Sequence, residues 1–139
     1  KADAGPNTAR CIGRVHDNIA SFVKRIREMI TRTGFIPDLA GNGNLIVTPR
    51  GGLKLVDINN IVRINIDDII RIDDKGYPSC DVSMQVLAIL EQVILGRTIA
   101  ENDPLYGIFL APKRRQAVKE LERTFYKKLT SGSGAAVPG

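Results

Sequence analysis

Three polar residues within a short part of the sequence, Asp38, Asn44 and Asp57, carry side-chain oxygen atoms that could act together at one site. Asp38 lies in a loop rich in Asn and Gly, Asn44 opens the β-rich run 44–48, and Asp57 lies near the end of the apolar run 53–58. A Pro/Gly turn separates the two runs, and this pattern predicts a β-hairpin with Asn44 and Asp57 together at its open end. Phosphoryl transfer needs a carboxylate that orients the attacking hydroxyl, and oxygen ligands that hold Mg²⁺ against the nucleotide phosphates. Asp38, Asn44 and Asp57 are residues of the types that this chemistry needs.

The order of these residues resembles the catalytic loop and metal-binding segment of kinase-like phosphotransferases, especially the aminoglycoside-phosphotransferase-like and small bacterial kinase-like branches. The resemblance implies that Asp38 is the catalytic base and that Asn44 and Asp57 bind Mg²⁺ and, through it, ATP. It also implies a kinase-like C-terminal lobe whose buried central helix begins near Asp81. In that lobe Asp81 would be a structural residue that accepts hydrogen bonds from the backbone of the catalytic loop.

The order of elements resembles the family over about residues 8–129. Specific motif residues match only in 38–59 and at the start of the central helix. The sequence departs from the family's pattern near each motif residue. Ile-Pro precedes Asp38 where the family has His-Arg or His-Gly, and Asn44 lies one residue farther along than usual. Ile-Asn follows Asp57 in place of Phe-Gly.

No glycine-rich loop or strand lysine precedes these residues in the sequence. We therefore expect ATP- and Mg²⁺-dependent phosphoryl transfer only where an N-terminal lobe, missing from this sequence, completes the site. The isolated chain is expected to be inactive.

Two alternatives remain open from the sequence. The first is a non-catalytic interaction module, or a degenerate kinase-like domain (a pseudokinase). In this alternative Asp38 and its Asn/Gly neighbours simply form a tight loop, and Asp57 is a polar residue at a strand end. The surface that normally meets an N-terminal lobe would then bind another protein chain or a second copy in a homodimer.

The second alternative is a nucleic-acid or anion-binding domain that uses a basic C-terminal helix. The net charge of +5 permits it. The positive charge is spread along helical faces, however, and no pattern of aromatic stacking residues accompanies it, which argues against nucleic acid as a partner.

The elements that must position these residues are mainly helical. Apolar residues at steps of three and four predict a long amphipathic helix from about 7 or 8 to 33, with Gly34 as its C-cap. A second helix from about Asp81 to 95 is apolar almost all round, so we expect it to be nearly surrounded by protein, with Asp81 as its N-cap and Gly96 at its end. A basic final helix is expected at about 112–129.

The intervening segments carry weaker signals. We expect a loop at 36–43, an irregular segment with one or two short strands or a helical turn at 59–75, and a short amphipathic segment at 102–110. The fold class is therefore α+β and mainly helical, with one domain over 1–130 and a flexible tail at 131–139. Four aspartates lie in the irregular segment, but their spacing lacks the alternating ligands of a calcium loop.

Composition limits the remaining function classes. The chain has 139 residues, a single histidine (His16) and two cysteines (Cys11 and Cys80) far apart in the sequence. His-rich metal sites are thereby excluded, and reduced cysteines in a cytoplasmic protein are the simpler interpretation. No apolar run is long enough to span a membrane, and no signal peptide is evident at the start of the sequence.

Overall fold

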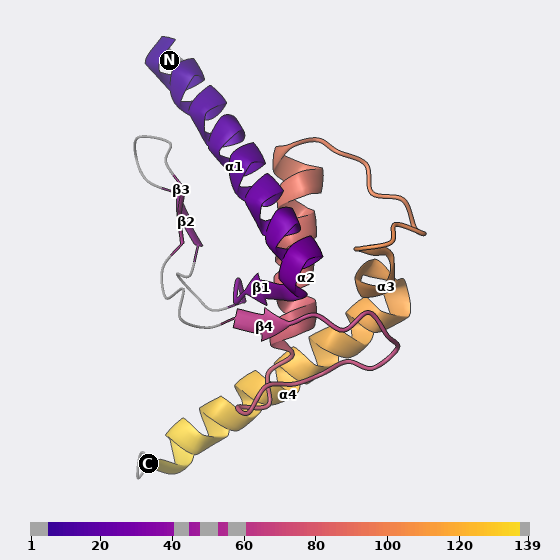
Figure 1. The fold of residues 1–139 in the computed structure, drawn as a ribbon. Coiled ribbons are helices and arrows are strands. Elements are labelled where there is room, and N and C mark those ends of the chain that lie inside the picture. Colours follow the sequence, from indigo (N-terminus) through magenta and orange to yellow (C-terminus); the bar gives the residue numbers. More distant parts are fainter. Residues whose placement is uncertain (1–5, 41–44, 48–52, 56–60, 137–139) are drawn as a thin grey trace.

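The described part of the chain starts with one long helix and ends with another, and the remaining elements pack against these two (Figure 1). The structure is a computed structural model that describes residues 6–40, 45–47, 53–55 and 61–136. Helices dominate, and the strands form two small antiparallel pairs, which confirms an α+β, mainly helical fold. The elements in chain order are α1 (Pro6–Thr33), β1 (Phe35–Pro37), β2 (Leu45–Val47), β3 (Leu53–Leu55), β4 (Ile61–Arg63), α2 (Ser79–Ile89), the π-helical turn η1 (Leu90–Ile94), α3 (Gly107–Leu110) and α4 (Pro112–Ala136).

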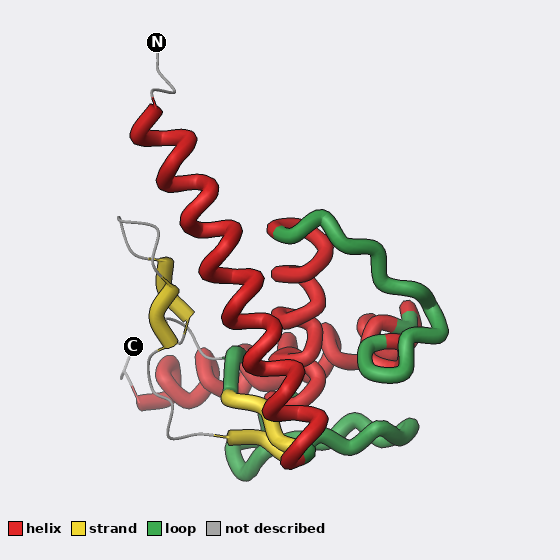
Figure 2. The backbone as a smooth tube through the Cα atoms, turned by 45° about the horizontal axis from the view of Figure 1, so that its top comes forward, coloured by secondary structure: helices red, strands yellow, loops and turns green. Residues whose placement is uncertain are grey.

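The long helix α1 confirms the prediction made from its apolar periodicity. Its C-terminal half lies beside α2 and η1, whereas its N-terminal half stands clear of the other helices in both views (Figures 1 and 2). Gly34 follows the helix with φ of 76°, a conformation that glycine adopts without steric cost, and its N–H donates to Ile30 O at 2.8 Å. The predicted C-cap is therefore confirmed. The residues of α1 that enter the core are Ile19, Phe22, Val23, Ile26 and Ile30.

The antiparallel pair β1–β4 lies at the C-terminal end of α1 (Figure 1). The prediction of a loop from residue 36 was wrong at its start, because Ile36 is fully buried in β1 opposite Val62 of β4. The prediction for residues 59–75, an irregular segment with one or two short strands, is confirmed by β4 and the loop that follows it.

The second pair, β2–β3, is the hairpin that the sequence predicts. It lies alongside α1 in both views, and Leu45 pairs with Leu55 while Val47 pairs with Leu53 (Figures 1 and 2). The pairing makes the start of β2 and the end of β3 the open end of the hairpin.

The α2–η1 helix ends where it was predicted to end, before Gly96 at φ of 66°, but its start and the burial of its last turn differ from the prediction. It begins at Ser79, with Pro78 at the N-cap position, so the prediction of Asp81 as N-cap was wrong, and Asp81 lies inside the first turn. The middle of α2 is buried as expected, but Val93 near the end of η1 is 71% exposed, so the helix is not surrounded there. The π-helical turn is closed by the N–H of Leu95, which donates to Leu90 O at 3.1 Å.

The last helix, α4, begins at Pro112 as predicted and crosses the end of α2 (Figure 1). It continues to Ala136, so the expected end near Leu129 was too early. Residues 131–136, which the sequence assigned to a flexible tail, are helical. Cys80 of α2 is a free, buried thiol, and burial raises its pKa.

Candidate functional site

The loop that carries Asp38 is attached to the buried helix α2. The backbone N–H of Leu39, whose side chain is in the core, donates to the Ser83 hydroxyl at 3.0 Å. The N–H of Ala40 donates to Asp38 Oδ1 at 2.9 Å, which closes a tight turn around the carboxylate. Among the described residues, Ser83 therefore binds this loop through its side chain, two positions away from the Asp81 expected from the kinase resemblance. That expectation about Asp81 was wrong.

Asp38 lines a small pocket of about 150 Å³. The pocket joins the Asp38 loop to the turn that precedes α2 and to the aromatic side chains of α4. It presents carboxylates, hydroxyl groups and one ammonium group, a set that can hydrogen-bond a small polar molecule beside the Asp38 carboxylate. The lining residues are Asp38, Ala40, Asp73, Lys75, Tyr77, Ser79, Phe125 and Tyr126.

Asp73 shapes the far wall of this pocket. One carboxylate oxygen accepts the backbone N–H groups of Lys75 and Tyr77, both at 2.9 Å, and the other accepts the Ser79 hydroxyl. Burial opposes ionisation of this carboxyl, but the Ser79 and backbone hydrogen bonds outweigh burial and lower its pKa. Both oxygens of Asp73 are thus used to hold the turn, which argues for a structural role.

Tyr77 lies between Asp73 and α4. Its hydroxyl donates to Glu122 at 2.7 Å, and its ring meets the ring of Phe125 edge-on with centroids 5.0 Å apart. Burial and then the Glu122 carboxylate raise the pKa of Tyr77, so its phenol stays neutral at physiological pH. The part of the pocket that Tyr77 lines is therefore a packed, hydrogen-bonded surface.

The two expected metal ligands, Asn44 and Asp57, lie outside the described residues. Asn44 directly precedes β2 in the sequence, and Asp57 lies two positions after β3. Carboxylate and amide oxygens are ligands of the type that Mg²⁺ prefers, so the donor set fits this ion. In the part of the chain that the structure describes, no group of three or more His, Cys, Asp or Glu side chains could hold a metal ion, the aspartates of the 59–75 segment included.

Asp81 forms a fully buried ion pair with Arg114 of α4. The guanidinium donates to both carboxylate oxygens, from Nε at 2.6 Å and from Nη2 at 3.0 Å. Arg114 also donates to the backbone oxygens of Asp67 (2.6 Å) and Ile69 (3.2 Å), and it stacks 5.0 Å from the centre of the Phe109 ring. This pair ties the irregular segment, α2 and α4 together.

A second buried carboxylate, Glu91 in η1, was missed by the sequence analysis. Arg27 Nη1 and Arg97 Nη1 each donate to it at 2.9 Å, and the Tyr106 hydroxyl donates to the oxygen that Arg27 also contacts. Burial opposes ionisation, but the bonds from Tyr106, Arg97 and Arg27 outweigh it and lower the pKa of Glu91. A single glutamate in an apolar helix was the only sequence signal for this cluster, and its partners are distant in the chain.

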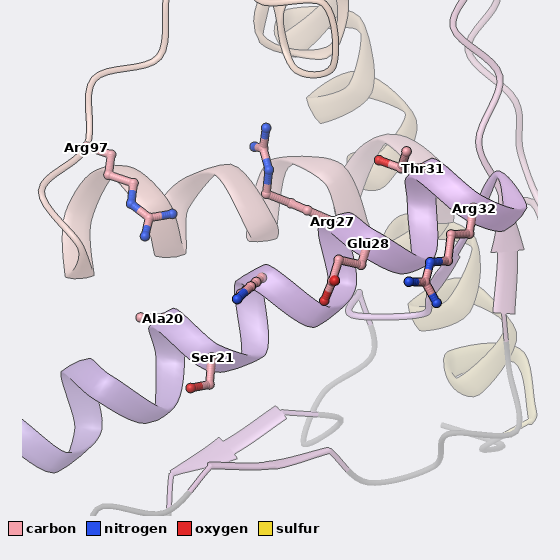
Figure 3. Close-up of a pocket in the computed structure, with 8 residues that line it drawn as sticks. Ala20, Ser21, Arg27, Glu28, Thr31, Arg32 and Arg97 are labelled. Carbon is pink, nitrogen blue, oxygen red and sulfur yellow. The ribbon is translucent and has the colours of Figure 1, made fainter.

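The two arginines that hold Glu91 also line a groove of about 580 Å³ on the surface of α1. Figure 3 shows Arg97 directed toward α1 from the segment after η1, while the other lining side chains come from α1 itself. The lining residues are Ala20, Ser21, Lys24, Arg27, Glu28, Thr31, Arg32 and Arg97.

Comparison with family models, with curated proteins and with solved structures finds no match to this chain. Within the described residues, no helix is both long enough and apolar enough to cross a membrane. Interpretation of the site therefore depends on its residues and geometry.

Proposed function

We propose that this chain is the C-terminal lobe of a kinase-like phosphotransferase, in which Asp38 orients the hydroxyl group that receives the phosphoryl group. The observation that carries the proposal is the position of Asp38. Its loop is bonded to Ser83 on the buried helix α2, and its carboxylate borders a pocket with room for a small polar group. A catalytic base must be held at a defined position beside its substrate, and a rigid helix provides that position.

The hairpin supports the same proposal. The register of β2 and β3 joins Leu45 to Leu55, so the hairpin's open end is the end that adjoins Asn44 and Asp57 in the sequence. In the proposed site these two residues hold Mg²⁺, which when bound neutralises charge on the nucleotide phosphates. The nucleotide itself also requires an N-terminal lobe or a second protein chain.

The proposal is tested by Mg²⁺-dependent ATP binding and phosphoryl transfer, measured on the longest form of the protein that its coding sequence yields. We expect Asp57→Ala to abolish Mg²⁺-dependent binding of ATP. Asp38→Asn should retain binding and lower the transfer rate by about a hundredfold or more, the usual contribution of a positioned acid–base group. Asp68→Asn, which changes an exposed aspartate outside the pocket, is the matched control and should leave both unchanged. Absence of ATP binding in the unmodified protein would contradict the proposal.

Ser83 provides a separate test of how Asp38 is positioned. Ser83→Ala removes the acceptor for the Leu39 N–H, so we expect the transfer rate to fall while the affinity for Mg-ATP stays the same. Equal losses in rate and affinity would indicate a general loss of structure, and thermal melting measures that loss directly.

A protein-interaction module is the second candidate function, favoured by exposed apolar side chains in the segment after β4. Ile66, Ile69 and Ile72 are each more than half exposed. Exposed apolar side chains, where they form a contiguous patch, are typical of sites that bind another chain or a second copy. Sedimentation of the protein over a range of concentrations tests the homodimer. Under this function, Ile69→Asp is expected to weaken self-association, and a concentration-independent monomer contradicts the homodimer.

A further inference from the structure

The groove along α1 is strongly basic. Four of its eight lining residues are Lys or Arg and only one, Glu28, is acidic. Lys24 and Arg32 form no ion pair with any residue that the structure describes. Even with buried Glu91 counted against Arg27 and Arg97, positive charge exceeds negative charge around the groove, so an anionic ligand is attracted to it.

Two of these cations are already fixed in place. Arg27 and Arg97 each use one Nη1 group on Glu91, and their side chains are 41% and 49% exposed. Arg27 also interacts with the Tyr106 hydroxyl and lies over the Tyr106 ring, whereas Glu91 is the only side-chain acceptor of the Arg97 guanidinium among the described residues. A ligand carboxylate can therefore bind preorganised arginines, which lose little conformational entropy on binding.

The length of the groove indicates an extended ligand. Its α1 residues run from Ala20 to Arg32, which spans about 18 Å at a rise of 1.5 Å per residue. Lys24 and Arg32 alone are separated by about 12 Å along the helix axis. In an extended peptide, side chains on one face recur about every 7 Å. Carboxylates on alternate residues can therefore reach Lys24 first, then Arg27 and Arg97, and then Arg32.

The uncharged and acidic lining residues favour a peptide over a nucleic acid. Ser21, Thr31 and Glu28 offer oxygen acceptors, which can accept the N–H groups of a peptide backbone. A phosphate backbone has no comparable N–H donors. None of the lining residues is an aromatic side chain on which a base could stack.

We propose that this groove binds an extended acidic peptide segment of a partner protein, with carboxylates on alternate residues. The proposal is independent of phosphoryl transfer, because none of the lining residues borders the Asp38 pocket.

A fluorescein-labelled decapeptide of alternating glutamate and serine tests the proposal by fluorescence anisotropy at low salt. We expect saturable binding that weakens as salt is added. The double variant Lys24→Glu with Arg32→Glu, both exposed and outside the Glu91 cluster, should bind at least about tenfold more weakly. Thermal melting of each variant shows whether its fold is retained.

The matched control is Lys119→Glu with Lys127→Glu, which makes the same change in net charge on exposed positions of α4. This variant should change the affinity less than about twofold. Equal losses in the two double variants would overturn the proposal, because they would show attraction to net charge alone. Absence of peptide binding overturns it as well. Tighter binding of a single-stranded oligonucleotide of equal charge, lost in the Lys24/Arg32 variant, would assign the groove to nucleic acid instead.

Discussion

At the N-terminal end of α2, Asp81 is buried against Arg114, and at the far end of the same continuous helix Glu91 is buried against Arg27 and Arg97. Both clusters contain an arginine over an aromatic ring, Arg114 over Phe109 at 5.0 Å and Arg27 over Tyr106 at 5.4 Å. The two ends of the helix thus use the same kinds of side chain.

The difference lies in where the arginines stand. The side chain of Arg114 is 7% exposed, and its guanidinium donates hydrogen bonds to Asp81 and to two backbone carbonyls. The side chains of Arg27 and Arg97 are almost half exposed, and each donates a hydrogen bond to Glu91 from one nitrogen, Nη1. A buried arginine whose three nitrogens all donate hydrogen bonds within the protein fixes the fold. An arginine held by one hydrogen bond and open to solvent keeps donors for a ligand.

The two clusters also differ in what they adjoin: only the Glu91 cluster contributes residues, Arg27 and Arg97, to the lining of a groove or pocket described above. Arg114 joins the irregular segment to α2 and α4, next to the turn that forms the wall of the Asp38 pocket. The Glu91 cluster joins α1 to η1 and to the segment after it, and it holds the two arginines at the mouth of the groove.

The largest expected effect comes from Asp81→Ala. Removal of the carboxylate leaves the Arg114 charge buried without a counterion, so we expect the free energy of unfolding to fall by about 3–5 kcal/mol. Urea unfolding followed by circular dichroism measures the loss. The matched control is Glu120→Ala, which breaks an exposed pair with Arg123 and should cost less than about 1 kcal/mol. Similar losses in the two variants would show that burial does not distinguish the pairs.

Glu91→Gln should have a smaller effect, although it removes a carboxylate with three donors. Arg27 and Arg97 are half exposed and can bind water once the charge has gone, so we expect a loss of about 2 kcal/mol in the same unfolding experiment. A loss as large as that of Asp81→Ala would contradict the distinction between the two ends of the helix.

The difference in unfolding free energy between the unmodified protein and Glu91→Gln should depend on pH. The pKa of Glu91 in the folded protein lies below its ordinary value of 4.5, so the unfolded chain takes up a proton at higher pH than the folded one. The stabilisation by Glu91 is therefore complete above about pH 4.5 and is lost as the pH falls through the folded-state pKa. The gap in unfolding free energy between the unmodified protein and Glu91→Gln should narrow in acid. Asp73, whose pKa is also lowered, is present in both proteins and cancels in the comparison. A gap that stays constant down to pH 3 would show that Glu91 stabilises by shape alone.

Much of the fold could be predicted because its signals are local. The stripe of apolar residues in α1, the Pro/Gly turn between β2 and β3, and glycines at positive φ after α1 and η1 were all evident from neighbouring residues. The pairing of Ile36 with Val62 depends instead on a partner far along the chain, and the short runs around these residues carry no signal for it. The helical continuation of α4 to Ala136 passes through glycines and serines of low helix propensity, which is why the prediction stopped early.

The candidate sites were predicted less completely. Asp38 could be selected because motif spacing is visible in a sequence, whereas its attachment to Ser83 joins residues 44 positions apart. Asp81 was correctly singled out as structural, but its partner, Arg114, was only one of several cations in the basic final helix, and nothing marked it as buried. Charged side chains are rarely buried, so a sequence of ordinary composition gives no reason to expect this one to be. The Glu91 cluster could not be predicted from the sequence for the same reason.

The smallest expected effect comes from Gly96, which ends η1 with φ of 66° and directs the chain so that the N–H of Arg97 donates to Glu91 O at 2.9 Å. A Cβ at this position meets no atom within 4 Å, so the cost of Gly96→Ala is conformational, about 1 kcal/mol. Gly13→Ala is the matched control, because Gly13 lies inside α1 with similar free space, and alanine there should stabilise the protein by about 0.5–1 kcal/mol. Opposite shifts of the two urea midpoints are the expected result. If Gly96→Ala were neutral, the turn would not fix the position of Arg97, and the groove would lose the preorganisation that distinguishes this end of the helix from the other.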